Sequence, residues 1–293
     1  MIVRNDYLLP GGRTGVLLIH GLTGTPTEMR GVAREFNRAG YTVYALQLAG
    51  HCGSVEDLVA TRWQDWYQSV VDGANKLREH VDSLFVCGLS MGAVLALKYA
   101  AAHSSHIKGV IAYSVTFRYD GWSIPPLSRF AAPWLLPLAG MLNVGRQRMF
   151  NEEPPYGIRN EALRKKIADK MHSGDSAAAG LPGNPWSSLN EFLLLSRNVR
   201  RKLHHIRTPC LLMHAVDDDI SHRRNAELVR DSVSGPVEMV LLPNSYHMIT
   251  IDNDRRELFH RSIAFAHRYS DERSHPVPLS TADLAPVLHE AAL

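Results

Sequence analysis

Hydrophobic residues along this chain fall into six short, uninterrupted stretches, separated by longer segments in which they recur every three or four positions. The short stretches do not alternate with polar residues, which is typical of parallel strands buried on both faces. The pattern predicts an α/β fold, with a mostly parallel central sheet and helices on both of its faces. We expect strands at 15–20, 41–46, 83–88, 109–114, 210–215 and 237–242. We expect helices at 28–39, 63–80, 91–103, 222–232 and 254–268.

The alternation of strands and helices stops between residues 117 and 207. This segment begins with the proline-rich stretch DGWSIPPLSRFAAPWLLPLAG, whose prolines are expected to prevent one regular helix. A Gly/Pro linker, GLPGNPW, and helical patterns at 159–172 and 187–203 follow, so the segment is predicted to be a helical insertion into the sheet protein. The predicted domains are a core of residues 1–116 and 208–270, this insertion of residues 117–207 and a C-terminal tail of residues 271–293.

The composition is that of an ordinary globular protein: 293 residues, 45% hydrophobic and 21% charged, with a net charge of +3. Basic clusters at 197–202 and 222–224 lack interleaved aromatic residues, so we interpret them as solvated surfaces and expect no nucleic-acid partner. The three cysteines have no paired spacing, which favours a reducing compartment and a cytoplasmic location. The longest uncharged stretch, 130–144, is too short and too proline-broken for stable membrane insertion. Both a monomer and a homodimer remain open.

One serine stands between two glycines in VCGLSMGA, residues 86–93. The Gly-x-Ser-x-Gly pattern alone is weak evidence, but here a predicted strand precedes it and a predicted helix follows it. Such a turn is sharp, and Gly88 and Gly92 leave room for it while the serine hydroxyl stays exposed. We predict Ser90 as a nucleophile and the Met91 amide as an oxyanion donor at the helix N-terminus. The alternative is that Ser90 only caps the helix.

A second oxyanion donor is expected in the loop after the first predicted strand, in VLLIHGLTGTP at 16–26. Gly21 lets the chain turn back toward the nucleophile, and the amide of Leu22 then points at the oxyanion. His20 is expected to bond loop backbone rather than to react. The alternative for this segment is an ordinary glycine-rich connection between a strand and a helix.

A hydroxyl needs a general base to become a nucleophile at neutral pH. Of the fifteen histidines, His247 follows a predicted strand directly, at the edge of the sheet where the loops after parallel strands gather. His51 lies in another such loop and is expected to organise it. The base needs an acid to orient its ring, and three adjacent aspartates, Asp217, Asp218 and Asp219, follow the strand at 210–215.

These pieces resemble the α/β-hydrolases, and more narrowly the bacterial carboxylesterase and monoacylglycerol lipase group. The matching segments are LLIHGLTGTP, GYTVYALQLAGHCGS, VCGLSMGAVLALKYA, HAVDDDISHRRNAELV and SYHMITIDNDRRELFHRSIAFA. The resemblance implies an α/β-hydrolase fold with neither cofactor nor metal. It also implies that Ser90 is the nucleophile, Asp218 the acid and His247 the base. The amides of Leu22 and Met91 would then form the oxyanion hole. Cys52 departs from the pattern, because such proteins commonly have glycine there.

The sequence therefore predicts a serine hydrolase that cleaves small-molecule carboxylic esters of short to medium acyl length, monoacylglycerols among them, through an acyl-enzyme. Thioesterase, lactonase or amidase activity at the same site are alternatives, as is a non-catalytic ligand-binding protein on this fold. The resemblance implies that the insertion at 117–207 is a lid or cap. This cap is expected to line the acyl pocket, unless its apolar side chains only pack the cap onto the core. The residues expected to bind substrate are Trp122, Phe130, Trp134, Leu135, Leu138 and Leu142.

Overall fold

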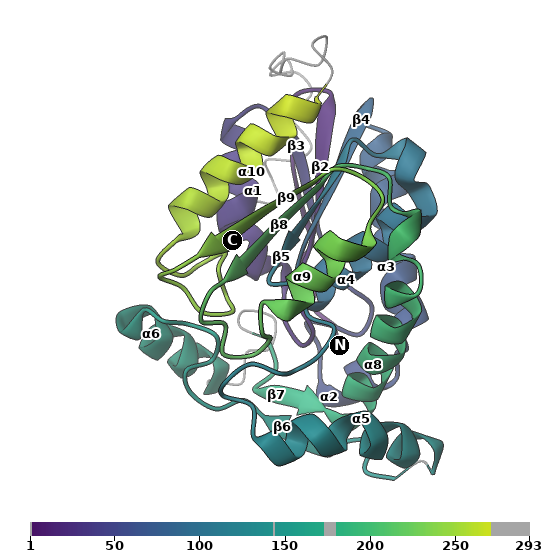
Figure 1. The fold of residues 1–293 in the computed structure, drawn as a ribbon, viewed down its shortest axis with the longest axis vertical. Coiled ribbons are helices and arrows are strands. Elements are labelled where there is room, and N and C mark those ends of the chain that lie inside the picture. Colours follow the sequence, from purple (N-terminus) through teal and green to yellow (C-terminus); the bar gives the residue numbers. More distant parts are fainter. Residues whose placement is uncertain (1, 143, 173–179, 271–293) are drawn as a thin grey trace.

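The computed structural model describes residues 2–142, 144–172 and 180–270 of the chain (Figure 1). The predicted C-terminal tail, 271–293, and the segment 173–179 of the predicted cap lie outside the described residues.

A seven-stranded sheet forms the centre of the fold, with the strand order β1-β3-β2-β4-β5-β8-β9. All neighbouring strands are parallel except β1, which pairs antiparallel with β3 at one edge. The six predicted strands are confirmed, whereas β1 was not predicted because three residues are too few to show a pattern. The strands are β1 Tyr7–Leu9, β2 Thr14–Ile19, β3 Thr42–Leu46, β4 Ser83–Leu89, β5 Gly109–Tyr113, β8 Cys210–Ala215 and β9 Val237–Leu242.

Helices cover both faces of the sheet, which is why its strands are hydrophobic at every position (Figure 1). In β2, Val16 and Leu18 pack toward one layer of helices and Leu17 and Ile19 toward the other, and all four are fully buried. One layer consists of α1 Arg30–Arg38 and α10 Arg255–Tyr269. The other contains α3 Trp63–Arg78, α4 Met91–His103, α8 Trp186–Arg200 and α9 Arg224–Ser232. The five helices predicted for the core are confirmed, and a short helix, α2 Val55–Val59, was not predicted.

The segment between β5 and β8 lies largely beyond the carboxyl edge of the sheet (Figure 1). Its elements are α5 Pro126–Met141, β6 Met149–Asn151, α6 Glu161–His172, β7 Gly183–Pro185 and α8, and β6 pairs antiparallel with β7. The last of these elements also belongs to the main core, because Phe192, Leu195 and Val199 of α8 are buried in the same cluster as α4. The cap is therefore joined to the core through a packed helix.

The expectation that prolines prevent a regular helix in the cap is wrong, since α5 continues through Pro133 and Pro137. Pro137 has no N–H, so the carbonyl of Pro133 loses its usual partner four residues later in the helix. The guanidinium of Arg197 supplies a replacement by donating from Nη2 to that carbonyl at 3.0 Å. A bond between two helices thus offsets part of the cost of the proline. None of the helices in the described ranges is long and apolar enough to cross a membrane.

Candidate active site

Ser90 lies in the sharp turn between β4 and α4 that the sequence predicts. Its backbone has φ 56° and ψ −115°, a left-handed conformation that is strained for a residue with a side chain. A hydrogen bond from its amide to the carbonyl of Tyr113, 2.9 Å long, holds it there. A Cβ atom on Gly88 would lie 2.1 Å from the carbonyl oxygen of Gly92, and one on Gly92 would lie 2.3 Å from that of Ile19. Both flanking glycines are therefore required by the close approach of backbone.

Three side chains from three loops form a hydrogen-bonded line at the carboxyl edge of the sheet. Ser90 follows β4, Asp218 follows β8 and His247 follows β9. His247 Nε2 lies 3.0 Å from Ser90 Oγ, and His247 Nδ1 lies 2.9 Å from Asp218 Oδ2. The Oδ1 atom of the same carboxylate accepts the amides of Ile220 and Ser221 at 2.9 and 2.7 Å. The carboxylate is thus fixed against the ring nitrogen that faces away from the serine.

The three adjacent aspartates have different surroundings. Asp217 is exposed and forms an ion pair with Arg159 at 3.3 Å. Asp219 is buried and accepts the backbone amides of Gly157 at 3.0 Å and His247 at 3.3 Å. Only the Asp218 carboxylate contacts the His247 ring in the described part of the chain.

The charges of Asp218 and His247 stabilise one another although both side chains are buried. Burial lowers the pKa of His247, but the Asp218 carboxylate, with smaller contributions from Asp219 and Glu152, outweighs it, so that the net pKa lies above the usual value of a histidine. Burial also raises the pKa of Asp218, but the charge and hydrogen bond of His247 bring the net pKa below that of a free carboxyl. The arrangement therefore favours an ionised carboxylate beside a readily protonated imidazole.

The predicted oxyanion loop lies against Ser90, the predicted nucleophile. A Cβ atom on Gly21 would lie 3.6 Å from that of Ser90, so the two turns are in contact. Among the described residues, neither the Leu22 amide nor the Met91 amide has a hydrogen-bond acceptor. His20 shapes this loop as expected, because its Nδ1 lies 2.9 Å from the carbonyl of Gly21 and its Nε2 accepts the amide of Leu48 at 3.2 Å.

The loop that contains His51 keeps the backbone conformation for which glycine is usual, since Cys52 has φ 62°. His51 is buried, and its Nδ1 lies 3.0 Å from the carbonyl of Ala49 within the same loop. The departure at Cys52 therefore changes the side chain and leaves the left-handed turn in place.

Thr116 is a neighbour of the nucleophile that the sequence analysis missed. Its Oγ1 lies 3.3 Å from Ser90 Oγ, where it accepts a hydrogen bond from the serine hydroxyl, and it donates to the carbonyl of Ser114 at 2.9 Å. It follows β5, so the argument that brings His247 to this sheet edge also applies to it. In the described ranges, no group of three or more His, Cys, Asp or Glu side chains is arranged to hold a metal ion.

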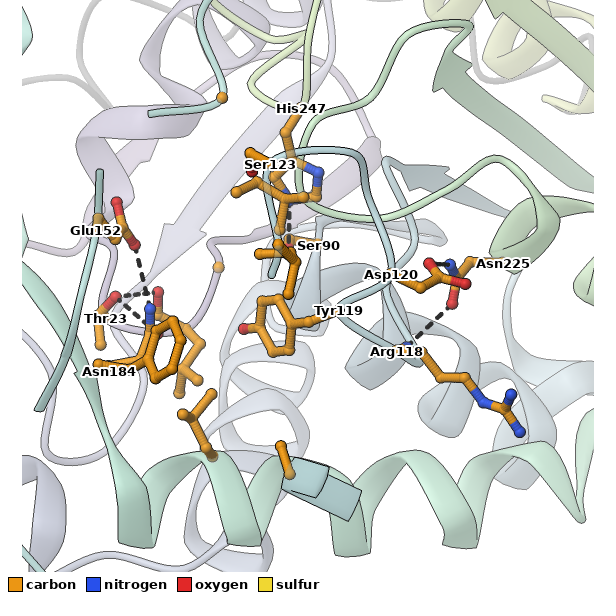
Figure 2. Close-up of a pocket in the computed structure, with 18 of the residues that line it drawn as sticks. Thr23, Ser90, Arg118, Tyr119, Asp120, Ser123, Glu152, Asn184, Asn225 and His247 are labelled. Atoms are coloured by element: carbon orange, nitrogen blue, oxygen red, sulfur yellow. Dashed lines mark hydrogen bonds between the residues drawn. The ribbon is translucent and has the colours of Figure 1, made fainter. Parts of the chain in front are cut away.

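A cavity of about 1110 Å³ lies above Ser90 and His247, between the sheet edge and the cap. On one side of the nucleophile it is lined by Thr23, Glu152 and Asn184, and on the other by Arg118 and Asp120 (Figure 2). The Asn184 amide bridges the first group, with bonds to Glu152 Oε1 at 3.3 Å and from Thr23 at 3.4 Å. The sequence analysis missed these residues because no local pattern brings Asn184 to Thr23, 161 residues earlier in the chain, or to Glu152, 32 residues earlier.

Two of the six cap residues expected to bind substrate line this cavity, namely Phe130 and Trp134. The other four, Trp122, Leu135, Leu138 and Leu142, are not among its lining. All six side chains are exposed, Phe130 and Trp134 by 76% and 73% and the other four by 48% to 62%, so exposure does not separate the two groups. The inner face of α5 is formed instead by Ala132, Pro133 and Leu136. Because α5 is apolar on several sides, its sequence does not show which side faces inward.

Comparisons with known proteins agree with this fold and site. A family model described as serine aminopeptidase, S33, matches residues 12–254. The chain is 30% identical over 260 residues to a thermostable monoacylglycerol lipase of Bacillus sp. (strain H-257), covering 88% of this chain and 92% of the relative. It is 26% identical over 266 residues to a carboxylesterase of Bacillus subtilis (strain 168), covering 90% and 96%.

Among solved structures, one from work on the metagenome-derived lipolytic enzymes LipS and LipT is similar to this one. It has a TM-score of 0.74 and 26% identity, and the alignment covers 92% of this chain and 100% of that one. The order of the strands, the turn at Ser90 and these similarities lead to one assignment. This chain belongs to the serine aminopeptidase S33 family of serine hydrolases, on the α/β-hydrolase fold.

Proposed function

We propose that the protein hydrolyses carboxylic esters with Ser90 as nucleophile, His247 as base and Asp218 as acid. The observation that carries this proposal is the line of hydrogen bonds from Ser90 Oγ through the His247 ring to Asp218, at the floor of a large cavity. The relatives named monoacylglycerol lipase and carboxylesterase support ester hydrolysis.

The geometry leads to a two-step reaction. Ser90 Oγ attacks the ester carbonyl carbon while its proton passes to His247 Nε2, and the amides of Leu22 and Met91 stabilise the negative oxygen that forms. The bond to the alcohol oxygen then breaks, and His247 returns the proton to the departing alcohol. Water next attacks the acyl-enzyme with His247 again as base, which releases the carboxylic acid and restores Ser90.

The lining of the cavity supports an ester whose alcohol carries hydroxyl groups. Glu152, Asn184 and Thr23 provide hydrogen-bonding groups within the cavity, whereas Phe130, Trp134 and Leu136 provide an apolar wall. A glyceryl group fits the first kind of surface and an acyl chain the second, so monoacylglycerols belong to the proposed substrate class. Thioesters, lactones and amides remain alternatives that share the same chemistry. A cytoplasmic location stays a prediction, supported by three cysteines that are all free and buried.

A fluorophosphonate probe tests the proposal directly. It is expected to label the wild-type protein and to leave the Ser90→Ala variant unlabelled, because it reacts only with an activated serine. Hydrolysis of a panel of 4-nitrophenyl, glyceryl and coenzyme A esters then separates esterase from thioesterase activity. Absence of labelling in the wild type would support the non-catalytic alternative.

The pH dependence of catalysis is expected to follow His247. As the pH falls through its pKa, Nε2 gains a proton and cannot accept the one from Ser90, so kcat/KM falls. Because burial is outweighed by the Asp218 carboxylate and the net pKa is raised, the loss is expected to begin at a higher pH than for an ordinary histidine. The measurement is kcat/KM for a neutral ester across the acidic and neutral range. A midpoint at or below that of a free histidine would contradict the proposed charge pair.

The preference for acyl length is expected to depend on Trp134. Its side chain lines the cavity, so Trp134→Ala opens space along the apolar wall and should move the optimum of a 4-nitrophenyl ester series toward longer acyl chains, with a change in relative kcat/KM of about fivefold. Leu138→Ala is the matched control, since Leu138 lies on the same helix outside the lining. If both variants keep the wild-type preference, Trp134 only packs the cap.

A further inference from the structure

Two basic clusters that lie far apart in the sequence reach the same end of the active-site cavity. Arg197 and Arg200 come from the end of α8, in the cluster 197–202, and Arg224 begins α9, in the cluster 222–224. Arg118, from the loop after β5, lines the cavity beside them. We call Arg118, Arg197, Arg200 and Arg224 the arginine end. The sequence analysis interpreted the two clusters as solvated surfaces, whereas the fold turns part of each toward the cavity.

The positive charge of this end is largely uncompensated. In the part of the chain that the structure describes, the guanidinium groups of Arg118 and Arg200 have neither a hydrogen-bond nor an ion-pair partner. Both line the same cavity, and after burial the charge of Arg118 also lowers the pKa of Arg200. Two neighbouring cations without a counter-ion repel one another, and an anion placed between them relieves that repulsion.

The carboxylate of Asp120 also lines this end of the cavity, and it already accepts hydrogen bonds from neighbouring groups. Asp120 Oδ1 accepts the His222 amide at 2.8 Å and the Asn225 side-chain amide at 3.0 Å. Its Oδ2 atom lies 3.7 Å from Arg224. Asp120 therefore fixes the loop and partly neutralises Arg224, which leaves Arg118 and Arg200 unmatched.

The opposite end of the cavity has the opposite character. Arg118 and Glu152 lie on opposite sides of Ser90 (Figure 2). Glu28 and Glu152 both line the cavity, and burial raises the pKa of both carboxyl groups, that of Glu28 to about 7, which lessens the negative charge of this end. A substrate with a negative group is therefore attracted to the arginine end, and this attraction orients it about Ser90.

We propose that the arginine end binds an anionic group, a carboxylate or a phosphate, that the ester substrate carries away from its scissile bond. Planar guanidinium groups bind either group through paired N–H donors. Because Arg118 and Arg200 are exposed at the rim, the gain is moderate and depends on salt. This inference rests on the proposed ester hydrolysis and narrows its substrate class.

Matched esters test the proposal. One set comprises 4-nitrophenyl monoesters of succinic, adipic and suberic acid, which end in a carboxylate, and the same compounds with that carboxylate methylated. A second set ends in a phosphate monoester or its neutral methyl ester. For at least one length, kcat/KM of the anionic ester is expected to exceed that of the neutral one by about fivefold to tenfold. The ratio should fall toward one in the Arg118→Gln/Arg200→Gln double variant, and in about 0.5 M salt.

The ratio is independent of how much of each preparation is folded, because both esters are measured on the same sample. Arg201→Gln is the matched control, since Arg201 is exposed at the end of α8 and lies outside the lining, and it should keep the wild-type ratio. A preference that either set shows and the double variant loses supports the proposal and identifies the anion. Equal rates in both sets, or a preference that survives in the double variant, would overturn it.

A binding measurement separates this inference from the proposed function. Calorimetric titration of the Ser90→Ala variant with monomethyl adipate and dimethyl adipate needs no turnover. Tighter binding of the anionic compound, lost when Arg118→Gln and Arg200→Gln are added, supports the arginine end even if the catalytic roles are wrong. Equal affinity for the two compounds, together with normal hydrolysis of neutral esters by the wild type, would overturn this inference alone.

Discussion

Replacement of Ser90 by alanine, or of His247 by alanine, is expected to lower kcat for a neutral 4-nitrophenyl ester by about 10⁴-fold or more. The reason is geometric: the single bond of 3.0 Å between Ser90 Oγ and His247 Nε2 is the path by which the hydroxyl loses its proton. Without the serine there is no acyl-enzyme, and without the histidine the hydroxyl stays protonated. The measurement is steady-state hydrolysis with highly purified protein.

The double variant distinguishes a catalytic pair from two independent contributions. If Ser90 and His247 act as one unit, Ser90→Ala/His247→Ala is about as slow as either single variant, because the first change has already removed the path. Ser105→Ala and His205→Ala are matched controls, since both residues are exposed and lie outside the cavity lining. A double variant much slower than both single variants would show that the two residues contribute separately.

The central sheet could be predicted because its strands are buried on both faces. Uninterrupted hydrophobic stretches such as β2 and β4 have no other common explanation, and the helices between them follow from their spacing. The positions of Ser90 and His247 follow from the same fact. Residues just after parallel strands meet at one edge of the sheet, however far apart they are in the sequence.

The cap could not be predicted in the same way, because its contacts depend on packing rather than on pattern. The two prolines inside α5, Pro133 and Pro137, argue against a helix locally, and the bond from Arg197 that offsets one of them comes from another element. Likewise, Asn184 meets Glu152 and Thr23 only once β6 and β7 pair above the oxyanion loop. Such contacts decide which cap residues face the cavity, and no periodicity encodes them.

The largest remaining expected effect concerns the three adjacent aspartates. Asp218→Asn is expected to lower kcat at neutral pH by about 10³- to 10⁴-fold, because an amide cannot stabilise the imidazolium and can turn an N–H toward the ring. The loss is expected to be smaller than that of Ser90→Ala, since the oxyanion amides and the cavity remain. The pH at which activity is lost should also move down, because the carboxylate that raises the pKa of His247 is gone.

The neighbouring aspartates provide controls with the same chemical change. Asp217→Asn removes only an exposed ion pair with Arg159, so kcat should stay within about twofold of the wild type. Asp219→Asn weakens a buried acceptor of the His247 amide and is expected to lower kcat about tenfold by displacing the loop. It should lower the pH at which activity is lost by less than Asp218→Asn does, because Asp218 raises the pKa of His247 more than Asp219 does. The size of the shift in the pH profile therefore separates the acid from the residue that positions the loop. A larger loss at Asp217 or Asp219 than at Asp218 would assign the acid to that residue instead, and the bond of 2.9 Å to His247 Nδ1 would then not be the catalytic one.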